Sequence, residues 1–388
     1  MQYVLKKYFS GLSTSTILLA FSSLFSDIST EMLYPILPIF ITQVLNAPAS
    51  IVGIVEGVAI GVQYTVQGFS GWISDKFQNH KRIALLGYGL NVISKPLTGV
   101  VTIWQQLLGA RFVDRVGAGT RSAPRDALIA GSADDKNRGK AFGLEGIGDN
   151  LGAFIGPLLA LVLLYAMHTS IRTIFYLAGI PALLAFIMIL FVKERKIEKT
   201  KTIIETHWNK FPTSYWKYIL VTALFGIGNS SNAFLILRTK QIGIPLFTTI
   251  VIYAFFNLVA ALSSYPAGFL SDKLGRKNVL LVSFLIFAAT YLGFSMSTNF
   301  FVISVLFILY GIYSGVSRAA GKALASDFVT QDLRASAIGW YSTTIGLTGF
   351  VASLVAGQLW TLVNPEATFV YGVISAVVGT IALIFLVS

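Results

Sequence analysis

Long apolar segments alternate with short polar ones along the whole chain. About 20 apolar residues in a helix cross the roughly 30 Å hydrocarbon core of a bilayer, and a backbone in lipid must be helical or form a closed barrel. Barrel strands alternate apolar and polar residues over about ten positions, whereas the apolar runs here are continuous. We therefore predict an all-α membrane protein. Its twelve transmembrane helices are expected at 15–41, 50–74, 83–101, 104–131, 140–166, 173–192, 216–237, 247–270, 278–297, 300–325, 335–362 and 367–387.

Composition supports a membrane protein. Only 12% of the 388 residues are charged and 55% are hydrophobic, against about 25% charged in an average soluble domain. The absence of cysteine excludes disulfides, thiolate metal sites and cysteine nucleophiles. Lys6 and Lys7 precede a long apolar stretch that shows no small-residue cleavage pattern. We therefore expect a retained first helix rather than a signal peptide.

The net charge of +12 is explained by orientation in the membrane rather than by binding of nucleic acid. If both termini are cytoplasmic, most Lys and Arg residues fall in cytoplasmic segments, and only Arg172, Arg238 and Lys240 lie near the outer side. Cytoplasmic loops of membrane proteins carry such an excess of Lys and Arg. The charge pattern therefore predicts a multi-pass protein with cytoplasmic termini.

The chain contains an internal repeat, which predicts two similar halves. Gly71-Trp-Ile-Ser-Asp-Lys76 recurs as Gly268-Phe-Leu-Ser-Asp-Lys273, each time at the end of a long apolar helix. A polar segment at 193–217 lies near the middle of the chain. We predict a six-helix bundle at 1–192, a cytoplasmic linker at 193–217 and a second six-helix bundle at 218–388. Duplicated transporter halves place the substrate site near the bilayer midplane between them.

The repeated loop resembles a signature of the major facilitator superfamily, and the resemblance covers essentially the whole chain. It implies a secondary transporter of the bacterial inner (plasma) membrane that works by alternating access, in a poorly characterised branch with exporter-like motifs. Arg111, Gly117 and Gly119 resemble the superfamily's fourth-helix signature. The loop is expected to act as a gate; a tight basic turn is the alternative. Its residues are Gly71, Asp75, Lys81 and Arg82 in the first copy and Gly268, Asp272, Arg276 and Lys277 in the second.

Ionisable residues inside the predicted helices are the main candidates for function, because such groups are costly in a membrane. Carboxylates four residues apart share a helix face and repel each other when both are ionised. All three histidines fall in loops, so protons would be carried by carboxylates. The alternative is a structural lattice of carboxylates and arginines. The predicted proton-coupling residues are Asp27, Glu31, Glu56, Asp114, Glu145 and Asp149.

The identity of the solute stays open at this point. Excess acid favours a cationic or lipophilic solute, whereas the cations favour a carboxylate or phosphate, such as an anionic metabolite or a polycarboxylate siderophore, which could also be imported. The predicted substrate and charge network consists of Tyr34, Lys95, Arg111, Arg115, Asn232, Asn257 and Arg318.

The fifth predicted helix indicates the direction of transport. Gly143, Gly152, Gly156 and Pro157 resemble the antiporter signature of superfamily exporters, which implies export of a solute in exchange for protons. Small residues at this spacing also serve plain helix packing, which is the alternative.

Other function classes fit the sequence less well. No histidine lies in the predicted membrane segments and no G-x-x-x-x-G-K-S/T loop is present, so we expect neither an enzyme nor an ATP-driven pump. A non-transporting receptor would not need two gating loops. We expect no catalytic residues, metal or cofactor. The expected partners are a small solute, protons and the lipid bilayer, and the chain is expected to be a monomer.

Overall fold

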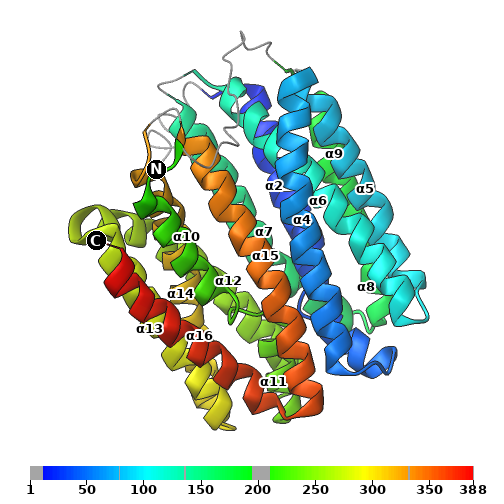
Figure 1. The fold of residues 1–388 in the computed structure, drawn as a ribbon. Coiled ribbons are helices and arrows are strands. Elements are labelled where there is room, and N and C mark those ends of the chain that lie inside the picture. The colour runs from blue at the N-terminus through cyan, green and yellow to red at the C-terminus, as the bar shows by residue number, and fades with distance from the viewer. Residues whose placement is uncertain (1–11, 78, 135–136, 195–209, 331–332, 388) are drawn as a thin grey trace, which may run out of the picture. The chain divides into compact units, whose positions relative to one another are not determined.

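The structure is a computed structural model that describes residues 12–77, 79–134, 137–194, 210–330 and 333–387, without the side chains of residues 75, 138, 265 and 335. Helices make up the fold, and these residues contain no strand. Figure 1 shows the helices in chain order, from blue to red. The predicted all-α membrane fold is confirmed.

The first six predicted segments correspond to nine elements. The first segment is divided at residues 34–36 and continues into a short π-helical turn, and the sixth is divided at Ala178. The elements are α2 (Thr14–Leu33), α3 (Leu37–Ile39), η1 (Phe40–Val44), α4 (Ala49–Phe77), α5 (His80–Val100), α6 (Trp104–Ser132), α7 (Arg138–Tyr165), α8 (Ile171–Leu177) and α9 (Gly179–Phe191).

The last six predicted segments correspond to seven elements. The seventh segment, predicted as one helix over 216–237, is divided by non-helical backbone at 227–232. The elements are α10 (Thr213–Gly226), α11 (Ala233–Gln241), α12 (Leu246–Leu274), α13 (Arg276–Met296), α14 (Phe300–Asp327), α15 (Arg334–Leu362) and α16 (Pro365–Leu386).

Nine helical spans of the described chain are long and apolar enough to cross a membrane. The three remaining segments are α5, α6 and the pair α10 and α11. Charged side chains lower the hydropathy of α5 and α6, whereas the break leaves α10 and α11 too short to qualify singly. These three segments also contribute the Asp114 and Arg125 side chains and the polar residues 229–232 described below.

The chain divides into two compact units. Unit 1 comprises residues 1–33 and 65–202, and unit 2 comprises 34–64 and 203–388. Helix α4 therefore begins in unit 2 and ends in unit 1. The predicted domain boundaries, at 192 and 217, stay a prediction.

In unit 1, a row of glycines brings two helices into close contact. A Cβ atom on Gly148 would lie 2.5 Å from the carbonyl oxygen of Ala20, and one on Gly152 would lie 2.6 Å from that of Leu24. Because no larger residue fits there, α7 packs directly on the backbone of α2. This contact sets the spacing of the carboxylates that both helices carry.

In each unit, an arginine from a neighbouring element binds the carbonyl end of a helix. Arg172 Nη1 donates to the carbonyl of Gly99, at the end of α5, over 2.8 Å. Arg238, which is 1% exposed, donates to the carbonyl of Phe294 near the end of α13 over 3.0 Å and pairs with Glu366. Terminal helix carbonyls lack intrahelical partners and favour a cation. The two arginines therefore stabilise the ends of α5 and α13.

Candidate functional site: two charge centres and a solute cavity

Asp114 forms the first charge centre, in unit 1. Its Oδ1 lies 2.9 Å from Lys95 Nζ, and its Oδ2 lies 3.3 Å from Arg111 Nη1 and 2.7 Å from Arg115 Nη2. The Asp114 side chain is 2% exposed. One buried carboxylate therefore holds three cations, which joins α5 to α6.

Polar side chains of α5 extend this centre. Asn91 donates to the backbone carbonyl and to Oδ1 of Asp114 over 2.7 and 3.0 Å, and Ser94 donates to the same Oδ1 over 3.0 Å. Asn91 also accepts from Arg121 Nε over 3.2 Å, and the Arg121 guanidinium lies 4.9 Å from the centre of the Tyr88 ring. These bonds fix Asp114 and extend the hydrogen-bonded network along α6.

Arg125 forms the second charge centre of unit 1, and here carboxylates are in excess. Arg125 lies 2.8 Å from Glu145, 3.6 Å from Asp149 and 3.2 Å from Asp126. Ser23 of α2 accepts from Arg125 over 3.0 Å and donates to Glu145 over 3.2 Å. One guanidinium thus faces three carboxylates drawn from α6 and α7.

Asp27 and Glu31 lie on the face of α2 that packs against the glycines of α7. A Cβ atom on Gly152 would lie 2.7 Å from the Cβ of Asp27, and one on Gly156 would lie 2.9 Å from the Cβ of Glu31. Asp27 interacts electrostatically with Asp149, with Glu31 and with two arginines of α6. The structure therefore brings Asp27 to the Arg125 centre, as the predicted carboxylate cluster requires.

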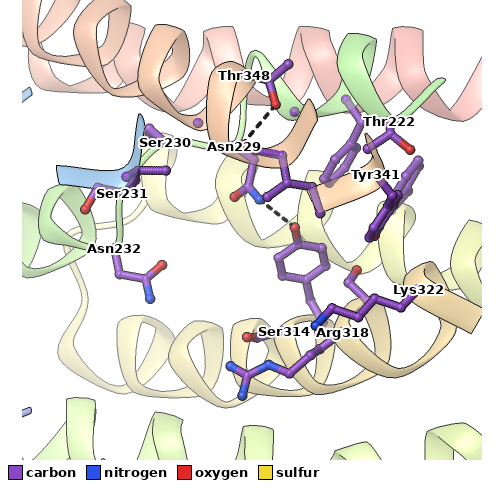
Figure 2. Close-up of a pocket in the computed structure, with 18 of the residues that line it drawn as sticks. Thr222, Asn229, Ser230, Ser231, Asn232, Ser314, Arg318, Lys322, Tyr341 and Thr348 are labelled. Atoms are coloured by element: carbon purple, nitrogen blue, oxygen red, sulfur yellow. Dashed lines mark hydrogen bonds between the residues drawn. The ribbon is translucent and has the colours of Figure 1, made fainter. Parts of the chain in front are cut away.

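Unit 2 contains a cavity of about 470 Å³. Tyrosines, neutral polar side chains and two cations line it, and Figure 2 shows the labelled polar side chains around a common space. The lining comes from residues 34–64 and from α10, α13, α14 and α15, together with the segment between α10 and α11. The predicted residues Tyr34, Asn232 and Arg318 are among those that line it.

The non-helical segment between α10 and α11 is held by tyrosine hydroxyls. The side chains of four successive residues each make a hydrogen bond to the hydroxyl of a different tyrosine, which gives these buried or part-buried polar side chains their partners. The pairs are Asn229 with Tyr313 (3.0 Å), Ser230 with Tyr291 (3.5 Å), Ser231 with Tyr34 (2.9 Å) and Asn232 with Tyr310 (2.9 Å).

Glu56 is connected to this segment. It is 4% exposed, and Ser231 donates to its Oε2 over 3.1 Å. Because the Ser231 hydroxyl donates its proton to Glu56, it accepts the hydrogen bond from the Tyr34 hydroxyl. Tyr34 lies at the break between α2 and α3, 197 residues before Ser231. The same offset separates the two copies of the loop motif, so the two breaks occupy equivalent places in the repeat.

Two cations of α14 reach the cavity one helical turn apart. Arg318 and Lys322 are both exposed and both line the cavity. Arg318 interacts electrostatically with Tyr64, and the stacked rings of Tyr218 and Tyr341, 5.8 Å apart, form a nearby wall. In the described part of the chain, neither cation is paired with a carboxylate.

The second copy of the loop motif forms ion pairs. Arg276 lies 2.8 Å from Asp327 at the end of α14 and 3.6 Å from Asp272 in the last turn of α12. Gly268 lies two turns from the end of α12, and Gly71 occupies the same place in α4. The motif therefore connects α12, α13 and α14 of unit 2.

The lysines of the two loop copies make equivalent bonds. Lys81 donates to the carbonyl of Leu190 over 2.8 Å, and Lys277 donates to the carbonyl of Ile384 over 3.2 Å. Each acceptor lies near the end of the last helix of its half. The side chain of Asp75 lies outside the described residues. A gating role of the motif stays a prediction.

The remaining predicted site residues lie apart from the centres and the cavity, or serve packing. Arg82 is exposed in the first turn of α5, Asn257 lies in α12 and does not line the cavity, and Gly143 and Pro157 lie in α7 on either side of the glycine contact.

Sequence reasoning missed several residues of these sites. Asn91, Ser94 and Lys95 occupy positions i, i+3 and i+4 of α5 and so share a helix face, yet only Lys95 is among the predicted site residues. Arg125 was visible as a membrane cation but was not assigned to the site. Lys322 is likewise a cation in a predicted membrane helix, and it follows the predicted site residue Arg318 by one helical turn.

Comparisons with known proteins identify the family. A sequence profile of the Major Facilitator Superfamily matches residues 19–247 and again 218–388. An uncharacterized MFS-type transporter of Methanocaldococcus jannaschii is 34% identical over 382 residues, which cover 97% of this chain and 95% of that protein. A probable 4-methylmuconolactone transporter of Cupriavidus pinatubonensis is 26% identical over 337 residues, 81% of this chain and 77% of the relative.

Solved structures share the fold. The crystal structure of the nucleoside transporter NupG, as its D323A mutant, matches with a TM-score of 0.81 and 14% sequence identity, over 96% of this chain and 100% of that one. These two relatives and this solved structure are named as transporters. The chain is therefore a multi-pass secondary transporter and belongs to the Major Facilitator Superfamily.

Proposed function

We propose that the chain is a proton-coupled exporter, which exchanges a small organic solute for protons by alternating access in the plasma membrane. The observation that carries this proposal is the excess of carboxylates at Arg125. One guanidinium cannot compensate Glu145, Asp149 and Asp126 at once, and Asp27 adds a fourth carboxylate while Arg121 adds only one more cation. A proton taken up by this centre reduces the repulsion among its acids.

The Asp114 centre has the opposite balance, so we assign it a structural role. Asp114 is predicted as a proton carrier, but protonating it would leave Lys95, Arg111 and Arg115 without their carboxylate. Removing one partner from a buried ionic network is strongly unfavourable. We therefore narrow the proposed proton carriers of unit 1 to Asp27, Glu31, Glu145 and Asp149.

The cavity of unit 2 is the proposed solute site. Its volume of about 470 Å³ lies in the range of about 300–1,000 Å³ that small-molecule sites occupy. A relative is named for transport of 4-methylmuconolactone, which supports a small organic solute for this chain.

The glycine contact between α2 and α7 supports the exporter assignment. The motif glycines Gly152 and Gly156 contact α2 beside Asp27 and Glu31. A change in the α2–α7 contact therefore moves the proposed proton carriers directly. The charge pattern also leads us to propose that both termini lie in the cytoplasm.

A flux experiment with imposed pH gradients tests the proposal. The purified full chain is reconstituted in vesicles loaded with labelled small aromatic acids, amides and amines, with the membrane potential clamped. We expect efflux of at least one class to accelerate when the outside is made acidic and to slow when the gradient is reversed. Glu145→Gln and Asp149→Asn should lose this response, whereas Asp134→Asn, at an exposed turn, should keep it. The proposal is wrong if no labelled class responds to the gradient, or if both centre variants respond as the wild type does.

A further inference from the structure

The charged side chains that line the unit 2 cavity are all cationic among the described residues. Arg318 and Lys322 line it, and no aspartate or glutamate is among its described lining residues. Glu56 is not a lining residue, and its carboxylate accepts from the lining residue Ser231. A wall lined by one sign of charge attracts solutes of the opposite sign and disfavours those of the same sign.

The two cations are placed to hold one acidic group together. They are four residues apart on α14, so their side chains leave the same helix face one turn apart. Figure 2 shows both side chains extending along α14 at the edge of the open space. A guanidinium binds two oxygens of a carboxylate or phosphate side by side, and an ammonium adds a point charge.

The rest of the lining suits a planar body with polar substituents. Tyr218 and Tyr341 are stacked with an interplanar angle of 8°, and Phe225 and Phe284 are stacked with their ring centres 3.8 Å apart. Asn229 and Asn232 line the cavity from the break between α10 and α11. Aromatic walls with a few fixed polar groups are typical of sites for small organic molecules.

We propose that this cavity binds an organic anion whose carboxylate or phosphate is held between Arg318 and Lys322, with an aromatic or similarly planar body against the tyrosines. This inference rests on the proposed solute site and names the class of solute. It decides between the cationic and the anionic solutes that the sequence left open, in favour of the anionic.

A set of probes with one ring and different charges tests the proposal. Benzoate, benzamide and benzamidinium have nearly the same shape and carry charges of about −1, 0 and +1 at neutral pH. Phenyl phosphate separates a preference for phosphate from one for carboxylate. Binding to the full chain in detergent is measured by calorimetry, which requires neither transport nor a pH gradient. We expect at least one of the two anions to bind, and benzamide and benzamidinium to bind at least about tenfold more weakly.

Substitutions in the cavity connect the preference to the two cations. Arg318→Gln and Lys322→Gln should each weaken anion binding by roughly tenfold or more, while Arg318→Lys and Lys322→Arg should keep most of it. Lys240→Gln removes a cation that does not line the cavity and should leave binding unchanged. Size-exclusion profiles identify any variant that fails to fold. If a Gln variant does not fold, anion binding is compared between the wild type and the two charge-conserving variants, Arg318→Lys and Lys322→Arg.

Each outcome decides the matter. Binding of benzamidinium at least as tight as that of the anions, binding of neither anion, or full anion affinity in both Gln variants would overturn the proposal. Failure of proton coupling gives a different pattern, because anion binding and its loss in Arg318→Gln would persist while flux ignored the pH gradient. Gradient-driven flux of amines alone would overturn the anion class and leave the coupling proposal intact.

Discussion

Asp114 and Asp126 lie on the same helix, α6, but differ in burial and in the number of cations that they pair with. Asp114 is 2% exposed and pairs with three cations, whereas the Asp126 side chain is 48% exposed and, among the residues that the structure describes, pairs only with Arg125. Breaking a buried ionic network costs about 3–5 kcal/mol, while an exposed pair contributes only about 0–1 kcal/mol. The two residues should therefore respond very differently to the same substitution.

We expect Asp114→Asn to destabilise the protein by about 3–5 kcal/mol, because Lys95, Arg111 and Arg115 would lose their shared carboxylate. Asp126→Asn, on the same helix, should cost less than about 1 kcal/mol. Thermal unfolding in detergent, followed by circular dichroism or intrinsic fluorescence, measures both. Equal melting temperatures for the two variants would show that the Asp114 centre is not a structural network.

At the level of helices, the glycines of α7 provide a matched pair for a packing test. A Cβ on Gly152 would meet the carbonyl oxygen of Leu24 at 2.6 Å and the Cβ of Asp27 at 2.7 Å, whereas one on Gly146 would meet nothing within 4 Å. Overpacking costs about 1–3 kcal/mol, and an unobstructed Gly→Ala change in a helix gains up to about 1 kcal/mol.

We therefore expect Gly152→Ala to lower the melting temperature and weaken the response of flux to a pH gradient, because it separates α2 from α7 beside Asp27. Gly146→Ala should leave both unchanged or raise the melting temperature slightly. Thermal unfolding and vesicle flux are measured on both variants together with the wild type. If Gly152→Ala matches Gly146→Ala in both assays, the close contact contributes neither to stability nor to coupling.

The helices were predictable from the sequence, but the breaks in them were not. Apolar length located nine of the segments directly, because lipid leaves few alternatives for the backbone, whereas α5, α6 and the pair α10 and α11 are less apolar or interrupted. The segment at 227–232 is predicted as helix, since hydropathy does not register which side chains of other helices bond to the polar side chains of a broken helix. Tyr313 and Tyr310, which bond Asn229 and Asn232, are about 80 residues away in sequence.

The candidate site was predictable only in part, for a related reason. Charged residues such as Lys95, Asp114 and Glu145 were recognised because charge is rare in lipid. Their pairing depends on which faces of α5, α6 and α7 meet, and a single sequence does not contain that information. Glu56 was grouped with the carboxylates of the first half, yet its segment clusters with unit 2 and it is bonded to Ser231.

At the scale of the whole molecule, the two units carry different chemistry. Unit 1 holds the carboxylate-rich Arg125 centre, and unit 2 holds the cavity with Arg318 and Lys322. In an exchanger, bound solute and bound proton weaken each other's binding. By linkage, the solute lowers the affinity for the proton by the same factor as the proton lowers the affinity for the solute. The two proposals therefore make a joint prediction that neither makes alone.

We expect binding of the anionic probe to release protons from the wild-type chain and to weaken as the pH falls from about 8 to about 6, a range in which benzoate itself stays ionised. Calorimetry in buffers of different ionisation enthalpy counts the protons released. Asp149→Asn should bind the probe with less proton release and a flatter pH dependence, because a carboxylate that exchanges the proton is gone. Arg318→Lys should alter affinity but keep the wild-type release, since its unit 1 carboxylates are intact. Proton release that is the same in Asp149→Asn as in the wild type would place the coupling proton outside the Arg125 centre, and Glu56, bonded to the lining residue Ser231, would be the next carboxylate to replace.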